Sequence, residues 1–120
     1  MRVLTGVDIE STARFKALFE KKKSVLRKNY SQQEWEYAEG NDKPWQSLAG
    51  IWCAKEAAVK CLNNLGSGFM FSDFNISHDN RGAPKVELHQ LEITSILINI
   101  SVSISHNKEQ TVAVVTALVD

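Results

Sequence analysis

The sequence predicts an α+β fold in which one long central helix packs on an antiparallel sheet. Two observations support this prediction: an alanine-rich helical segment occupies the middle of the chain, and segments with the two-residue alternation of β-strands lie toward both ends. Hydrophobic residues make up 43% of the 120 residues and charged residues 23%, which is ordinary for a globular protein. We therefore expect a single domain over residues 1–120.

The charge balance and the two cysteines restrict the classes of function. Lys and Arg together number 14, as do Asp and Glu, so the chain lacks the overall positive charge typical of nucleic-acid binders. Cys53 and Cys61 lie on one predicted helix, about 12 Å apart at 1.5 Å rise per residue, which is too far for a disulfide. The sequence has no signal-like or membrane-length apolar run. We expect free thiols and a cytoplasmic protein, with neither a membrane nor a nucleic-acid partner.

The first predicted strand covers residues 2–10 and carries a carboxylate near its end. Alternation along the strand places Asp8 on the same face as Gly6. Because glycine has no side chain, we expect open space above that face, from which a ligand can approach Asp8. Ser11 or Thr12 then caps a helix that runs from about residue 12 into the 20s and ends in lysines, which suit the negative end of the helix dipole.

The next two helices have clear start signals. Ser31 followed by Glu34 is a capping box, which predicts a short helix over residues 31–39. Pro44 suits the first turn of the long helix, which we expect to end near Leu65 at a glycine loop. The many small residues of the long helix predict that it packs closely on the sheet.

The last part of the chain is predicted to form strands. A segment over residues 69–79 is followed by a turn at 80–82 and by PKVELHQ, and two strands follow at about 96–105 and 111–119. Residues 87–96 fit either a strand or a short helix.

Three residues suggest chemistry on the long helix and the first strand. Glu56 and Lys60 lie one turn apart, in one stripe with Trp52. On one interpretation they form an exposed ion pair worth about 0.2–0.5 kcal/mol, and Asp8 is only the polar end of a strand. On the other, Asp8 and Glu56 converge as ligands of Mg²⁺, which often uses one or two carboxylates together with phosphates and waters. Lys60 would then hold a phosphate as a point charge.

Two further segments suit an anion. Gly66, Ser67 and Gly68 either offer backbone N–H groups to a phosphate or serve only as a helix C-cap and turn. Ser105 and His106, at the end of a strand, either contact a phosphate or carboxylate or lie in solvent. The other histidines show no metal-ligand spacing with the cysteines, so we expect no zinc site.

Four segments that follow one another along most of the chain have a familiar order: GVDIE, LAGIWCAKEAAVK, FSDFNISHDNRGAPKVEL and SVSISHNKEQTVAVV. Each is modest alone, but the ordered set resembles the holo-[acyl-carrier-protein] synthase family of 4'-phosphopantetheinyl transferases. The resemblance implies an enzyme that moves the 4'-phosphopantetheine arm of coenzyme A to a serine of an apo acyl carrier protein. Adenosine 3',5'-bisphosphate would be released.

The resemblance also implies roles for individual residues. Asp8 and Glu56 match the family's magnesium ligands, and Glu56, directly or through a water, would take the proton from the carrier serine. Lys60 and His106 match residues that contact coenzyme A phosphates. The metal would neutralise charge on the leaving phosphate, as divalent ions do in phosphoryl transfer.

Family members form trimers with active sites at subunit interfaces, so the resemblance implies a homotrimer. The carrier protein is acidic, and Arg14 matches a family position that touches it. Lys21 lies in the same basic stretch, and a local basic patch can steer an acidic partner despite zero net charge. We interpret Lys22 and Lys23 as a solvated helix end.

The sequence departs from the family pattern at three places. Ile51 stands where many members carry arginine, so one basic contact to coenzyme A is either missing or supplied elsewhere, for which Lys55 is one candidate. The loop NNLGSGF is shorter than usual, and residues 87–97 lack the helix expected before the last strands. Two alternatives stay open: the same chemistry on a specialised polyketide-type carrier, and a non-catalytic scaffold of the same fold that binds the carrier.

Overall fold

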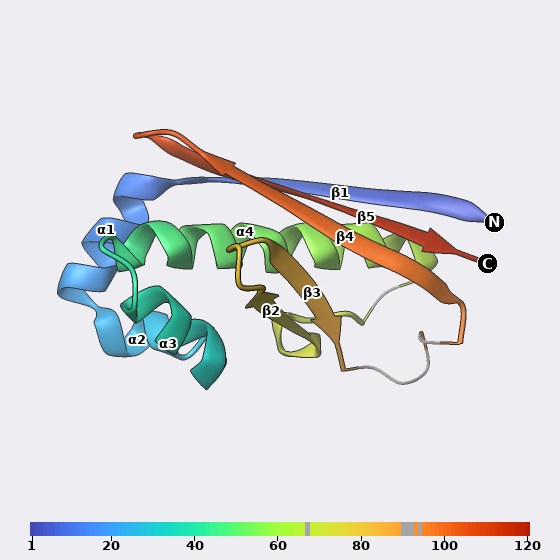
Figure 1. The fold of residues 1–120 in the computed structure, drawn as a ribbon, viewed down its shortest axis with the longest axis horizontal. Helices are drawn as coiled ribbons and strands as arrows, with labels where there is room; N and C mark the ends of the chain where they lie inside the picture. Colours follow the sequence, from blue (N-terminus) through green and yellow to red (C-terminus); the bar gives the residue numbers. More distant parts are fainter. Residues whose placement is uncertain (67, 90–92, 94) are drawn as a thin grey trace.

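The computed structural model describes residues 1–66, 68–89, 93 and 95–120. The elements follow in the order β1 (Arg2–Ser11), α1 (Thr12–Lys21), α2 (Lys23–Arg27), α3 (Gln32–Glu39), α4 (Pro44–Leu62), η1 (Asn63–Leu65), η2 (Phe71–Asp73), β2 (Phe74–His78), β3 (Pro84–Leu88), β4 (Leu97–His106) and β5 (Gln110–Val119) (Figure 1). Within the described ranges, no helix combines the length and the apolarity needed to cross a membrane.

A three-stranded antiparallel sheet, with strand order β1-β5-β4, lies along one side of α4 (Figure 1). β1 and β5 pair without interruption from Arg2↔Val119 to Ser11↔Gln110, so the two ends of the chain lie side by side. β2 and β3 form a separate two-stranded ribbon that contacts α4 and β4. This arrangement confirms the predicted α+β fold.

The sheet and α4 approach each other closely at Gly6. A Cβ atom added to Gly6 would collide with the carbonyl oxygen of Ala57 and would lie 2.6 Å from the backbone nitrogen of Cys61. Our prediction of open space above this face is therefore wrong, because the backbone of α4 fills that space. Glycine is required here so that the strand and the helix can touch.

A second apolar cluster holds the short helices to the first half of α4. Its buried members are Phe15, Leu26, Trp35, Ala38, Leu48 and Ala49. Trp52 extends this cluster, since its ring lies edge-on to Phe15, with centroids 5.7 Å apart, and to Phe71, with centroids 4.8 Å apart. The stripe that Trp52 shares with Glu56 is thus apolar at one end.

A buried ion pair fixes α4 to α3 and β2. The Glu34 side chain is fully buried, and its Oε1 accepts from the Lys55 ammonium at 2.6 Å and from the Ser31 N–H at 2.8 Å. Its Oε2 accepts from the Ile76 N–H at 2.7 Å. The capping box predicted from the sequence is present, and the same carboxylate joins three elements.

The predicted helix boundaries are correct to within a few residues. α4 begins at Pro44 and ends at Leu62, with a 3₁₀ turn continuing to Leu65. The Ser11 hydroxyl caps α1, but α1 ends at Lys21 and α2 follows as a separate helix. We expected one helix into the 20s.

The strands likewise begin and end close to their predicted places. β4 and β5 lie within one residue of the predicted strands, and β3 ends at Leu88. In the ambiguous segment 87–96, residues 90–92 and 94 lie outside the described residues. Cys53 and Cys61 are both free and buried, as predicted.

Gly6→Ala is expected to lower the free energy of unfolding by about 3 kcal/mol, because overpacking between two backbones cannot be relieved by a side-chain rotation. Urea unfolding would measure this change. Gly40→Ala is the matched control: a Cβ there would lie 3.5 Å from the Tyr37 carbonyl oxygen, which is ordinary contact. Equal stability of the two variants would contradict the close approach at Gly6.

Lys55→Met is expected to lower the free energy of unfolding by about 3–5 kcal/mol, because it leaves the buried Glu34 carboxylate without its counter-charge. The double variant Glu34→Gln, Lys55→Met should recover part of this loss in the same urea experiment. Lys28→Met, at an exposed lysine, serves as the control. If Lys55→Met and Lys28→Met are equally stable, the buried pair of Glu34 and Lys55 does not contribute to the free energy of unfolding as proposed.

Candidate active site

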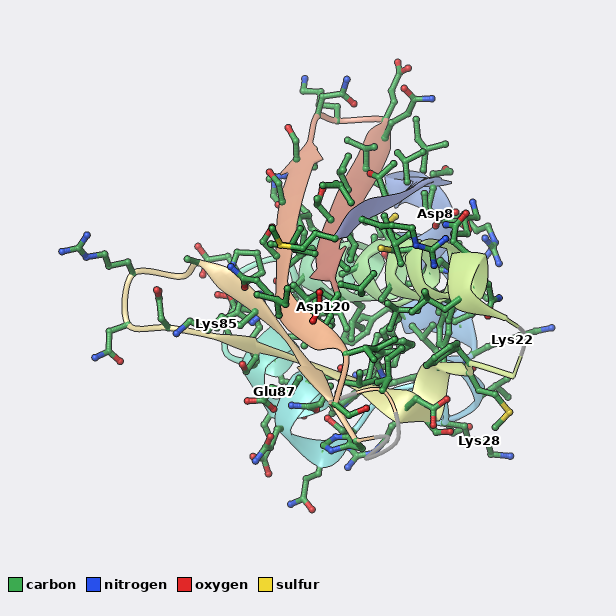
Figure 2. All side chains as sticks on the ribbon, turned by 90° about the vertical axis from the view of Figure 1, so that its right-hand side faces the viewer. Asp8, Lys22, Lys28, Lys85, Glu87 and Asp120 are labelled. Carbon is green, nitrogen blue, oxygen red and sulfur yellow. The ribbon has the colours of Figure 1, made fainter. Side chains whose placement is uncertain are left out.

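Strand β1 places Asp8 against α4 (Figure 2). Asp8 pairs with Ala113 of β5 and lies on the sheet face that α4 covers, two residues beyond Gly6. The Asp8 side chain is 12% exposed, and its Oδ1 accepts from the Lys60 ammonium at 3.2 Å. Its Oδ2 is buried and, the neighbouring Cys53 thiol aside, has no hydrogen-bond donor among the described residues. A buried carboxylate oxygen without a partner is costly, so this atom suits a bound cation.

Glu56 lies close enough to Asp8 for their charges to interact. Burial raises the pKa of the Glu56 carboxyl above its ordinary value, the negative charge of Asp8 raises it further, and the Lys60 ammonium lowers it. Lys60 also donates to the carbonyl oxygen of Val7 at 3.1 Å. The structure therefore brings Asp8, Glu56 and Lys60 together, and the ion pair of Lys60 is with Asp8 rather than with Glu56.

Two carboxylates on facing elements fit a magnesium ion. Among the described residues, no group of three or more His, Cys, Asp or Glu side chains is placed to hold a metal. Magnesium commonly takes only one or two protein carboxylates and completes its shell with substrate phosphates and waters. The open Oδ2 of Asp8 and the nearby Glu56 carboxylate match that requirement.

Cys53 borders this site, which the sequence reasoning missed. Its thiol donates to the carbonyl oxygen of Thr111 at 3.4 Å. Burial, the charge of Asp8 and a hydrogen bond to the Asp8 side chain raise the pKa of Cys53 to about 12, which favours a protonated thiol in the metal-free protein. The helical spacing of Cys53, Glu56 and Lys60 is a signal that could have placed the thiol on this side of α4.

The other predicted residues lie apart from Asp8 within one chain. His106 is the last residue of β4 and pairs with Thr111 of β5, so β5 lies between it and β1. Ser105 belongs to the neighbouring row, opposite Val112, and therefore faces the other side of the sheet. The structure does not bring Ser105 or His106 to the Asp8 carboxylate.

His106 instead lines two neighbouring cavities, of about 240 Å³ and about 370 Å³. The smaller cavity contains Tyr37 and His78, whose rings stack with centroids 3.7 Å apart, and the His78 Nδ1 is buried without a partner among the described residues. Burial lowers the pKa of His78, which favours a neutral imidazole. The larger cavity brings His106 together with Lys16, Lys43 and Lys108.

These two cavities could not be predicted from local sequence patterns, because their residues come from distant segments. Ile51 lines the smaller one and is 1% exposed. Lys55, named as one possible source of the missing basic contact, is buried and paired with Glu34, and it also lines a cavity of about 410 Å³.

The glycine loop begins directly after η1. Gly66 and Gly68 have φ values of 146° and 108°, a backbone region that favours glycine. The N–H of Gly66 donates to the Asn63 carbonyl oxygen at 3.2 Å, which is the role of a helix C-cap rather than of an anion contact. Ser67 lies outside the described residues.

The predicted carrier-binding residues lie on α1. Arg14 is 54% exposed on its side chain and pairs with Glu10 at 2.9 Å, so it remains accessible to a partner. Lys21 ends α1 and lines a surface hollow together with Lys22, Lys23 and Arg27. Glu20 and Glu39 line the same hollow, so the surface around Lys21 carries both signs of charge.

Known proteins resemble the whole chain. The model of the 4'-phosphopantetheinyl transferase superfamily matches residues 5–115. The holo-[acyl-carrier-protein] synthase of Caldanaerobacter subterraneus subsp. tengcongensis is 30% identical over 122 residues, covering 98% of this chain and 96% of that protein. Fatty acid synthase subunit alpha of Saccharomyces cerevisiae is 35% identical over 115 residues, covering 91% of this chain but 6% of that protein.

A solved structure shows the same fold. The crystal structure of Helicobacter pylori holo-[acyl-carrier-protein] synthase in complex with coenzyme A has a TM-score of 0.74 to this chain and 31% identity, covering 98% of this chain and 100% of that one. These matches confirm the resemblance seen in the four sequence segments. The chain belongs to the holo-[acyl-carrier-protein] synthase family within the 4'-phosphopantetheinyl transferase superfamily.

Proposed function

We propose that this protein is a magnesium-dependent holo-[acyl-carrier-protein] synthase, which transfers the 4'-phosphopantetheine arm of coenzyme A to a serine of an apo acyl carrier protein. The observation that carries the proposal is the buried, unpartnered Oδ2 of Asp8, set beside Glu56 and Lys60. The relatives that are named holo-[acyl-carrier-protein] synthase, one of them in complex with coenzyme A, support the same donor and acceptor.

The chemistry divides among three side chains. Asp8 and Glu56 would hold the magnesium ion, which when bound would neutralise charge on the transferred and leaving phosphates. Lys60 binds a phosphate oxygen as a point charge, and its side chain is 52% exposed, so it can turn toward a ligand. Glu56, directly or through a water, would take the proton of the carrier serine.

The nucleotide end of coenzyme A binds beside His106. The lysines of the larger cavity supply positive charge there, which supports an anion contact even though Ile51 replaces an arginine of the family pattern. Gly68 and Ser105 remain further candidates for contacts to this ligand. The amide of Gly66 is already used within the chain.

We further propose a homotrimer whose active sites lie between subunits. Apolar side chains are exposed on the sheet face opposite α4. They are Val3, Val7, Ile9 and Val114, with exposed fractions of 69%, 54%, 55% and 40%. An exposed apolar patch of this kind marks a contact surface. Ser105 lies on the same face. A site shared between copies would bring one copy's His106 to another copy's Asp8, which a single chain does not do.

Arg14 and Lys21 are the proposed contacts to the acidic carrier. The identity with a fatty acid synthase subunit favours, as a second candidate, a carrier that belongs to a larger synthase. The free, buried thiols support a reducing compartment such as the cytoplasm.

Intact mass spectrometry tests the transfer. Apo acyl carrier protein, incubated with this protein, coenzyme A and magnesium, should gain the mass of one phosphopantetheine arm, and a chelator should prevent the gain. Asp8→Asn and Glu56→Gln should each slow the transfer by about 100-fold or more, because acid–base and metal roles contribute on that order. Glu36→Gln, at an exposed glutamate on α3, is the control.

The outcomes separate the alternatives. Transfer only to carriers from larger synthases would favour the second candidate. Absence of transfer to every carrier, by a folded protein, would reject the enzyme and leave the carrier-binding scaffold. Full activity of both carboxylate variants would reject the assignment of Asp8 and Glu56.

Light scattering after size exclusion tests the trimer. The protein should elute with three times the 13.5 kDa mass of one chain. Val3→Glu should shift it toward the monomer, since a charge would then be buried in the contact. Val25→Glu, at an exposed valine of α2, should leave the trimer intact. A monomeric wild-type protein would exclude the shared site.

A further inference from the structure

Lys60 occupies a position that a cation bound to Asp8 would have to share. Its ammonium lies 3.2 Å from Asp8 Oδ1 and 3.1 Å from the carbonyl oxygen of Val7, so it already neutralises the carboxylate. The Lys60 side chain is 52% exposed whereas that of Asp8 is 12% exposed. The lysine can therefore leave the contact toward solvent, but the carboxylate cannot follow it.

The surroundings of this ion pair are negative. The negative charges of Asp8 and Glu10 both raise the pKa of Glu56, so the three carboxylates repel one another. Arg14 compensates Glu10 at 2.9 Å on the neighbouring turn. Lys60 is thus the cation in contact with Asp8 among the described residues, and its charge opposes any divalent ion held a few ångströms away.

We propose that Lys60 is an internal counter-ion that couples phosphate binding to metal binding. In the free protein its ammonium neutralises the pair of Asp8 and Glu56 and lowers the affinity of that pair for a divalent cation. A phosphate ligand that draws the ammonium away from Asp8 restores that affinity. This inference rests on the proposed function, in which Asp8 and Glu56 hold the metal.

The coupling is reciprocal. Binding of the metal and binding of the phosphate both break the ion pair between Lys60 and Asp8. A cation that displaces Lys60 from Asp8 therefore also frees the ammonium to bind a phosphate. A phosphate bridging to the metal would add a second, direct coupling. Removing the charge of Lys60 separates the two contributions.

Manganese binding to the metal-free protein, followed by the electron paramagnetic resonance of free Mn²⁺, tests the proposal without any transfer reaction. Lys60→Met removes the charge while keeping an unbranched side chain, and should bind Mn²⁺ about tenfold more tightly than wild type, the factor expected for a unit charge about 5 Å from a divalent ion in water. Lys60→Arg keeps the charge and should bind like wild type. Lys85→Met is the matched control, because Lys85 is exposed on β3, on the opposite side of the molecule from Asp8 (Figure 2).

A second titration measures the coupling itself. In wild type, saturating coenzyme A should tighten Mn²⁺ binding, and in Lys60→Met that tightening should be smaller by the same factor of about ten. Equal or weaker binding of Mn²⁺ by Lys60→Met in the absence of coenzyme A would overturn the counter-ion role.

A separate variant tests whether the metal binds at Asp8. Asp8→Asn should abolish Mn²⁺ binding in both wild-type and Lys60→Met backgrounds. If Asp8→Asn keeps full affinity, the metal site is not at Asp8, and the counter-ion role falls with it. If Asp8→Asn loses binding but Lys60→Met matches wild type, the metal site stands and only the counter-ion role is rejected.

Discussion

The contact between β1 and α4 at Gly6 is the constraint on which the rest of the structure depends. Since no side chain separates the two backbones there, the strand lies directly on the helix, and Asp8, two residues later on the same face, is pressed against the turn that carries Glu56 and Lys60. A wider spacing between β1 and α4 would move the Asp8 carboxylate away from Glu56 and Lys60. The arrangement of Asp8, Glu56 and Lys60 therefore depends on the absence of a side chain at Gly6 as well as on the side chains present.

The opposite side of α4 is fixed by different means. The buried pair of Glu34 and Lys55 ties the helix to α3 and β2, and its oxygens are all used within the protein. Two adjacent residues of α4 thus have different surroundings: Lys55 is buried and paired with Glu34, whereas Glu56 is partly exposed beside Asp8 and Lys60. Neighbouring positions on one helix can therefore place a buried ion pair on one side and the candidate site on the other.

The fold could be predicted from local signals, because the strands alternate, Ser31 and Glu34 cap a helix, and Pro44 begins one. Helical periodicity and the family resemblance also placed Glu56 and Lys60 on one stripe. Sequence could not show that Lys60 pairs across to Asp8, since a tertiary contact replaces the local one. Nor could it show the stack of Tyr37 and His78, because neither residue has a local reason to meet the other.

The pairing of the first and last strands has a consequence for how such a domain is carried. Arg2 and Val119 are partners in the sheet, and both ends emerge at the same extremity, away from α1, α2 and α3 (Figure 1). A longer polypeptide can therefore enter and leave through a single point without crossing the face that α4 covers. The same fold can therefore exist as a separate chain or as a small part of a much larger polypeptide.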